Sequence, residues 1–156
     1  MAAGAISNVR RFEGMASIKG FRIGYVLWVP VASSNGTSLG YDAANISVDP
    51  MSMTNHFDET IVCFHGWLDN ANSFATLAPL LATKFNMRVI GVDLPGHGKS
   101  SHSKLGYYTM PTYCTAIVRL LHRLRLRAFH LMAHSLSAVC PPLYLPLFLG
   151  IRSVIL

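Results

Sequence analysis

Residues 129–138, Phe-His-Leu-Met-Ala-His-Ser-Leu-Ser-Ala, decide how the rest of this chain is interpreted. The run from Phe129 to Ala133 is mostly apolar, which is typical of a buried β-strand. His134 and Ser135 follow at once, and the residues after them are small or apolar. This pattern predicts a strand that turns sharply into a helix, with Ser135 on the turn.

A serine on such a turn is well placed for nucleophilic catalysis. Its hydroxyl is lifted clear of the sheet, and the backbone N–H of the next residue, Leu136, can point at a developing oxyanion. The usual form of the turn is Gly-x-Ser-x-Gly, whereas Ala133 and Ser137 hold the two glycine places here. Because a serine between apolar segments is more often an ordinary turn or helix N-cap, the assignment depends on other motifs.

A second motif follows a short apolar run, Thr60–Phe64, which predicts a strand. The next residues are His65, Gly66 and Trp67, and glycine can adopt the conformation that turns the following N–H inward. The Trp67 N–H is therefore a candidate second oxyanion donor, opposite Leu136. His-Gly is also a common turn, and it gains weight from the serine turn about 70 residues later.

The third motif is Asp93-Leu94-Pro95-Gly96-His97-Gly98-Lys99-Ser100-Ser101, after a predicted strand over Met87–Val92. Its glycines predict a tight loop. A nucleotide-binding P-loop is excluded, because His97 stands where that motif requires lysine. We expect Asp93 to stabilise the loop by accepting hydrogen bonds from its backbone N–H groups.

The remaining apolar patterns predict alternating strands and helices. Strands are expected over 21–31, 41–48 and 151–156, and helices over 72–84, from about Pro111, and over 136–148. This alternation predicts an α/β fold with a mostly parallel sheet flanked by helices. Residues 1–20 are expected to form an N-terminal tail, and residues 21–156 a single partial domain.

From about Ile61 onward the chain resembles the N-terminal half of an α/β-hydrolase-fold protein, and the motifs 64–70 and 93–101 resemble the serine hydrolase-like branch. The resemblance implies Ser135 as nucleophile and the backbone N–H groups of Trp67 and Leu136 as the oxyanion hole. It gives supporting places in the motifs to four further residues: His65, Gly66, Asp93 and His134.

Two catalytic groups of that family, the acid and the histidine of the triad, have no counterpart in this sequence. In the family the triad acid and histidine follow the nucleophile, but no Asp or Glu occurs after Asp93 and no histidine after His134. We therefore expect an α/β-hydrolase fold truncated after about the sixth strand. It would act as a serine hydrolase of esters or similar small apolar substrates, through an acyl-enzyme, only as a longer chain. The alternative is a catalytically inactive pseudo-hydrolase that binds a partner.

The distribution of charged and apolar residues argues against two other kinds of protein, one that binds nucleic acid and one that spans a membrane. The formal net charge is +6, but the cations of residues 119–127 suit the negative end of a helix dipole, so we expect no nucleic-acid partner. The uncharged run 128–150 contains three prolines and two histidines, so we expect no transmembrane segment. Self-association through an exposed sheet edge is expected to be a hazard.

The 3 cysteines have no metal or disulfide spacing. We expect neither a cofactor nor a metal, and a cytoplasmic location because free cysteines suit a reducing compartment. The basic residues Arg10, Arg11 and Lys19 give a weaker indication of organelle targeting.

Overall fold

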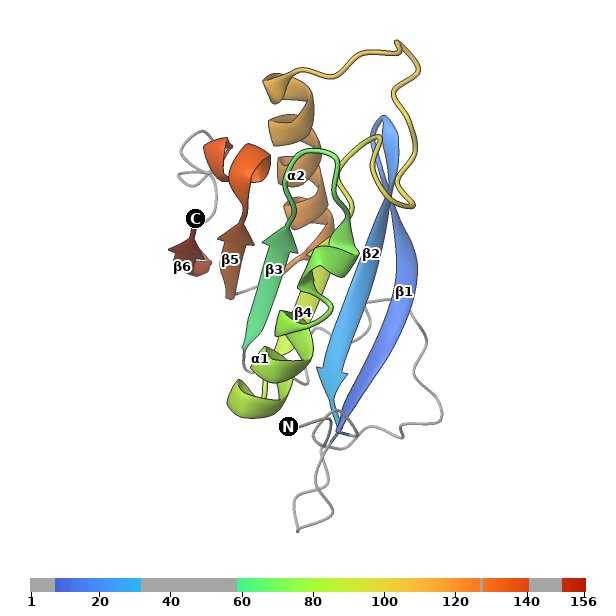
Figure 1. Ribbon diagram of the computed structural model, residues 1–156. Helices are drawn as coiled ribbons and strands as arrows, with labels where there is room; N and C mark the ends of the chain where they lie inside the picture. Colours follow the sequence, from blue (N-terminus) through green and yellow to red (C-terminus); the bar gives the residue numbers. More distant parts are fainter. Residues whose placement is uncertain (1–7, 32–58, 127, 141–149) are drawn as a thin grey trace.

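The computed structural model describes residues 8–31, 59–126, 128–140 and 150–156, and in them six strands form one sheet (Figure 1). Its centre consists of three short apolar strands, β3 (Thr60–Phe64), β4 (Arg88–Val92) and β5 (Phe129–Ala133). Strand β3 pairs in parallel with both β4 and β5. Every residue of β3 and β4 is buried, as expected for parallel strands covered on both faces.

The outer strands complete the order β1-β2-β4-β3-β5-β6. Strands β1 (Val9–Ile18) and β2 (Phe21–Pro30) form an antiparallel hairpin, and β2 pairs antiparallel with β4. Strand β6 (Ile151–Ile155) lies parallel to β5. The sheet is therefore mostly parallel, which confirms the predicted fold class.

The N-terminal tail predicted over residues 1–20 is wrong for Val9–Ile18, which is strand β1. Alternate residues from Phe12 to Ile18 are half-buried against the sheet, whereas the residues between them, Glu13, Met15 and Ser17, are exposed. Gly20, at φ +97°, makes the tight turn into β2. The strand predicted over 41–48 lies outside the described residues.

Helices cover both faces of the sheet. Helix α1 (Leu77–Phe85) packs on one face with Val26, Trp28 and Val89 among the buried residues. Helix α2 (Met110–Leu124) packs on the other, and Figure 1 shows the two helices on opposite sides. Thr109 caps α2 with its hydroxyl, and Asn86 ends α1 in the left-handed conformation.

Two predicted helices differ in detail. The helix expected over 72–84 is divided into a 3₁₀ turn, η1 (Ala71–Phe74), and α1, whose first turn accommodates Pro79. After β5 the described chain forms a 3₁₀ helix, η2 (Ser135–Val139), and the rest of the helix expected to residue 148 lies outside the described residues. No helix in the described segments is long and apolar enough to cross a membrane.

This topology brings the three motifs together at the carboxyl ends of the central strands. The loops 65–70, 93–101 and 134–135 follow the carboxyl ends of β3, β4 and β5, and these strands are parallel neighbours. In open α/β sheets, ligands bind at the carboxyl ends of the strands.

Candidate active site

Ser135 lies on a strained turn immediately after β5. Its backbone φ is +54°, a left-handed conformation that costs a non-glycine residue about 1–3 kcal/mol. The residue is exposed, and η2 begins there. The structure thus confirms the predicted sharp turn from strand to helix and places the serine at its apex.

Ser137 occupies one of the places usually held by glycine and fits there by making hydrogen bonds. It is 1% exposed, and its Oγ donates to the carbonyl of Phe64 over 2.8 Å. The same oxygen accepts from the His134 N–H over 3.1 Å, and that N–H also donates to the Phe64 carbonyl over 3.0 Å. Ser137 therefore ties the serine turn to the end of β3.

His65 is fully buried and fixes the backbone beside the serine. Its Nε2 accepts from the Leu94 N–H over 2.9 Å, so Nδ1 carries the proton and donates to the Gly66 carbonyl over 2.7 Å. Burial lowers the pKa of His65 and favours this neutral form. With both ring nitrogens engaged, His65 holds the loop in shape and is not available as a general base.

Gly66 packs directly against the serine turn. A Cβ on Gly66 would lie 3.1 Å from the Ser135 Cβ and 3.0 Å from the His134 Nδ1. Such distances are shorter than most Cβ contacts in proteins, so a larger residue at this position would push on the serine turn, and glycine allows the close approach. The peptide between Gly66 and Trp67 consequently lies next to Ser135, and the His134 ring flanks it.

The N–H groups of Trp67 and Leu136 donate to no acceptor among the residues that the structure describes. The carbonyl of the Gly66–Trp67 peptide is held by His65, and in a trans peptide the N–H points in the opposite direction. Leu136 lies in the first turn of η2, where N–H groups have no partner within the helix. Both donors are therefore open to an incoming acceptor.

His97 supports the same loop from the glycine-rich segment, a role that the sequence alone did not indicate. Its Nε2 accepts from the Leu68 N–H over 3.3 Å, and its Nδ1 lies 3.0 Å from the Pro95 carbonyl. Its ring meets the Trp67 ring edge-on, with 5.8 Å between the ring centroids. Leu68 has a φ of +57°, so this contact holds a strained part of the loop.

Asp93 links two loops through hydrogen bonds. One is the glycine-rich loop that follows β4, as predicted, and the other is the loop that leads into η1. The Asp93 Oδ2 accepts from the Lys99 N–H over 2.8 Å, and its Oδ1 accepts from the Ala71 N–H of η1 over 2.7 Å. Gly98 lies at φ +51°, and a Cβ there would overlap the Asp93 carboxylate. The buried carboxylate thereby fixes the spacing between the loops after β3 and β4.

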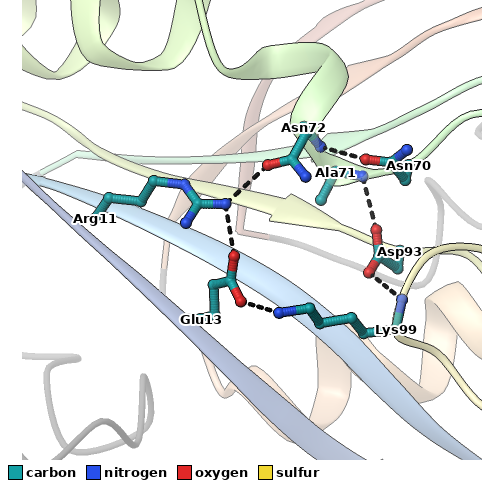
Figure 2. Close-up of polar contacts among 7 residues, drawn as sticks. All are labelled: Arg11, Glu13, Asn70, Ala71, Asn72, Asp93 and Lys99. Carbon is teal, nitrogen blue, oxygen red and sulfur yellow. Dashed lines mark hydrogen bonds and ion pairs between the residues drawn. The ribbon is translucent and has the colours of Figure 1, made fainter.

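Strand β1 reaches the same two loops through a polar network (Figure 2). Arg11 forms an ion pair of 2.7 Å with Glu13 and donates to the Asn72 side chain over 2.8 Å. Glu13 also pairs with the Lys99 ammonium, and Lys99 followed by Arg11 lowers the pKa of its carboxyl. Strand β1, which lies within the predicted tail, therefore braces the loops around the site.

No side chain of the described residues forms a hydrogen bond with the Ser135 hydroxyl. A Ser-His-Glu chain does exist elsewhere: the His130 Nδ1 lies 2.7 Å from the Ser153 Oγ, and its Nε2 lies 2.7 Å from the Glu59 carboxylate. His130 is at the start of β5, at the opposite end of that strand from Ser135, so it does not serve this serine. Within the described part of the chain, no group of three His, Cys, Asp or Glu residues could hold a metal ion.

A sequence model described as the alpha/beta hydrolase fold matches residues 59–139, which contain all three motifs. This chain belongs to the alpha/beta hydrolase fold family. It is 38% identical over 78 residues to a serine hydrolase-like protein of Danio rerio, over 49% of this chain and 23% of the relative. It is 40% identical over 80 residues to the human serine hydrolase-like protein, over 51% of this chain and 38% of the relative.

A third relative is a probable lysophospholipase of Arabidopsis thaliana, 36% identical over 89 residues, which are 54% of this chain and 19% of the relative. Among solved structures, a thioesterase domain from the curacin pathway matches 93% of this chain with a TM-score of 0.66 and 20% identity. A haloalkane dehalogenase of Agrobacterium tumefaciens matches 98% with a TM-score of 0.65 and 17% identity. These matches cover 45% and 42% of the two solved chains, and at such identities they establish the fold alone.

Proposed function

We propose that this chain carries the nucleophile and the oxyanion hole of a serine hydrolase acting on esters or similar small apolar substrates. The observation that carries the proposal is the contact between two loops. Ser135, strained at φ +54°, packs against Gly66, and the flanking N–H groups of Trp67 and Leu136 have no described acceptor. The names of the relatives, serine hydrolase-like protein and probable lysophospholipase, agree with ester chemistry.

In the proposed reaction the Ser135 Oγ attacks the carbonyl carbon of the ester and transfers its proton to a histidine base. The carbonyl π electrons move to the oxygen, which accepts hydrogen bonds from the N–H groups of Trp67 and Leu136. When the tetrahedral intermediate collapses, the alcohol leaves with the proton, and an acyl group remains on Ser135. Water, deprotonated by the same base, then releases the acid and restores the serine.

No described residue supplies the histidine base or the acid that would orient it. In this fold they follow the nucleophile in the chain, and the matched segment spans only 23% of the Danio rerio relative. We propose that the activity belongs to a longer chain that contains both groups.

The second candidate is a catalytically inactive pseudo-hydrolase that binds a partner, and the absence of a described base beside Ser135 favours it. Strand β6 is at the end of the described sheet and offers an edge for strand pairing with a partner or with a second copy. This candidate predicts a complex that survives the substitution Ser135→Ala.

The experiment that separates the two uses a fluorophosphonate probe on the native protein, with the labelled peptide identified by mass spectrometry. Labelling at Ser135 that is lost in Ser135→Ala and kept in Ser153→Ala supports the hydrolase. Ser153 is the right control because its hydroxyl lies within hydrogen-bond distance of a histidine ring, that of His130. An unlabelled wild type, with partner binding intact in Ser135→Ala, would sink the hydrolase proposal.

We further propose a cytoplasmic location. Cys63, Cys114 and Cys140 are all free and buried, and burial raises the pKa of the Cys63 thiol to about 12. Fractionation of the source cells tests the location, and recovery in an oxidising compartment would contradict it.

A further inference from the structure

A second serine, Ser153, contacts a histidine that is in turn held by a carboxylate. The Ser153 Oγ lies 2.7 Å from the His130 Nδ1, and the His130 Nε2 lies 2.7 Å from a carboxylate oxygen of Glu59. A hydroxyl within reach of a base, with that base oriented by a third group, is the arrangement of an activated nucleophile. These residues lie outside the three motifs around Ser135 and take no part in its proposed reaction.

The pairing of the strands places the three side chains in a row. His130 of β5 is paired with Ser153 of β6 on one side and with Ile61 of β3 on the other. Glu59 lies two residues before Ile61, and because side chains alternate along a strand it shares that residue's face of the sheet. The Glu59 carbonyl accepts from the Arg88 N–H over 3.0 Å, which fixes its backbone beside β4. The row from Glu59 through His130 to Ser153 therefore crosses one face of the sheet.

The hydrogen bonds define where the proton lies in the neutral His130 ring. A carboxylate only accepts, so Nε2 carries the ring proton and donates it to Glu59. Nδ1 then has a free lone pair, and the Ser153 hydroxyl donates to it. The other carboxylate oxygen of Glu59 pairs with the Arg152 guanidinium, which holds the carboxylate in this orientation. His130 is thus in position to remove the proton of Ser153.

The row is accessible to a reactant. Ser153 is exposed, and the side chains of His130 and Glu59 are 24% and 32% exposed. Two residues farther along β5 and β6, on the same face, Met132 is paired with Ile155. Met132 is half-buried and Ile155 is 48% exposed, so the pair presents an apolar surface next to the serine.

We propose that Ser153 is a second nucleophilic serine, which takes an apolar acyl group from an activated ester. The Ser153 Oγ attacks the carbonyl carbon of the ester, and its proton passes to the His130 Nδ1. The C–O bond to the leaving group then breaks, the leaving group takes up that proton, and the acyl group remains on Ser153. Glu59 stabilises the imidazolium that forms between the two steps. Because no residue of the Ser135 site takes part, this proposal does not depend on the proposed function.

The acyl group should remain on Ser153 for longer than on an ordinary catalytic serine. Ser135 begins the helix η2, where unpaired N–H groups can converge on an oxyanion, whereas Ser153 lies within strand β6. Successive N–H groups of a strand point to opposite sides, so they do not converge in this way. Acylation therefore needs an activated leaving group, and attack by water on the acyl-serine is slow. The expected product is a covalent modification of Ser153, not rapid turnover.

The test treats the full chain with p-nitrophenyl butyrate in a Ser135→Ala background, so that the first serine does not contribute. We expect release of about one equivalent of p-nitrophenol and one butyryl group on Ser153, located by tandem mass spectrometry. In this background His130→Gln should slow acylation of Ser153 by about a hundredfold, the usual contribution of a general base. No acylation of Ser153, or an unchanged rate in His130→Gln, would overturn the proposal.

Glu59 acts through His130 and is a positioning residue, so its test needs a matched control. Glu59→Gln should slow acylation by about tenfold or more, because an amide stabilises the imidazolium less than a carboxylate does. Arg152→Gln removes an ion pair of the same carboxylate but leaves its contact with His130, so the rate should change by less than about threefold. Equal slowing in both variants would show that Glu59 only supports the fold, and would overturn its role. If His130→Gln fails to fold, this pair of variants decides the proposal.

The apolar surface is tested by the length of the acyl group. p-Nitrophenyl butyrate should acylate Ser153 several-fold faster than p-nitrophenyl acetate, because the additional methylenes contact Met132 and Ile155. Ile155→Ser should reduce this preference, whereas Leu156→Ser, at the next and also exposed residue, should keep it. Equal rates of acylation by the two esters would overturn the assignment of an apolar acyl donor.

Discussion

Gly66 and Ser135 are packed so closely that a Cβ on the glycine would lie 3.1 Å from the Cβ of the serine. The two residues follow parallel neighbouring strands, β3 and β5, and each begins the loop or turn that carries one candidate oxyanion donor. The substitution Gly66→Ala should therefore displace the Trp67 N–H without removing the nucleophile. We expect fluorophosphonate labelling of Ser135 to slow by about a hundredfold, the usual cost of a misplaced group.

The matched substitution for this prediction is Trp67→Phe. The Trp67 side chain is 58% exposed, and the proposed role belongs to its backbone, so labelling should slow by less than about tenfold. Equal rates for Gly66→Ala and wild type would show that the loop contact does not position a donor.

The left-handed backbone of Ser135 predicts a gain of stability when the serine is replaced by glycine. Glycine adopts φ +54° without the steric cost that Ser135 bears, so Ser135→Gly should raise the free energy of unfolding by about 1 kcal/mol. Ser135→Ala keeps a Cβ and should not produce this gain. Urea unfolding of the three proteins measures the difference, and equal stability of the glycine and alanine variants would contradict the strain.

The parts of this fold that the sequence predicted are those encoded by local pattern. The apolar runs at β3, β4 and β5 end just before His65, Asp93 and His134, so the sequence predicts each of these strands and the motif that follows it. The hydrogen bonds of Asp93 to its glycine-rich loop also followed from the motif alone.

The parts that the sequence missed depend on contacts between distant segments. Strand β1 was hidden because Arg11 and Glu13, which face outward to Asn72 and Lys99, give its sequence the character of a charged tail. The half-buried alternation from Phe12 to Ile18 was the available signal.

The role of His97 was missed for a similar reason. Nothing in the glycine-rich motif shows that its ring will accept a hydrogen bond from Leu68, 29 residues earlier. The Arg119 guanidinium likewise donates to the Lys19 carbonyl across 100 residues, a contact that no local pattern indicates.

Removing the hydroxyl from each of two neighbouring tyrosines should change the free energy of unfolding in opposite directions. Tyr113 is 2% exposed, and its hydroxyl is buried without a hydrogen-bond partner among the described residues. Because an unsatisfied buried polar group costs about 1–3 kcal/mol, Tyr113→Phe should raise the free energy of unfolding by about 1 kcal/mol. The ring of Tyr108 stacks on that of Tyr113, but its hydroxyl accepts from the Ser103 N–H over 2.9 Å. Tyr108→Phe should therefore lower the free energy of unfolding by about 1 kcal/mol, and changes of the same sign would refute this assignment.

The buried neutral His65 should make the fold sensitive to acid. Burial lowers its pKa below the ordinary value of 6.5, so between the two values the unfolded chain binds a proton that the folded chain does not. The stabilisation is complete above about pH 6.5 and is lost as the pH falls toward the folded pKa. Urea midpoints measured between about pH 7.5 and pH 5 should decline less steeply in His65→Gln than in wild type.

The comparison for this last experiment is His102→Gln, which changes an exposed histidine. Its urea midpoints should decline with pH as steeply as those of the wild type. If His65→Gln keeps the full decline, the acid sensitivity has another origin. If it removes the decline and also slows labelling of Ser135, one buried histidine sets both the stability of the fold and the shape of the proposed oxyanion loop, because its Nδ1–H holds the Gly66 carbonyl.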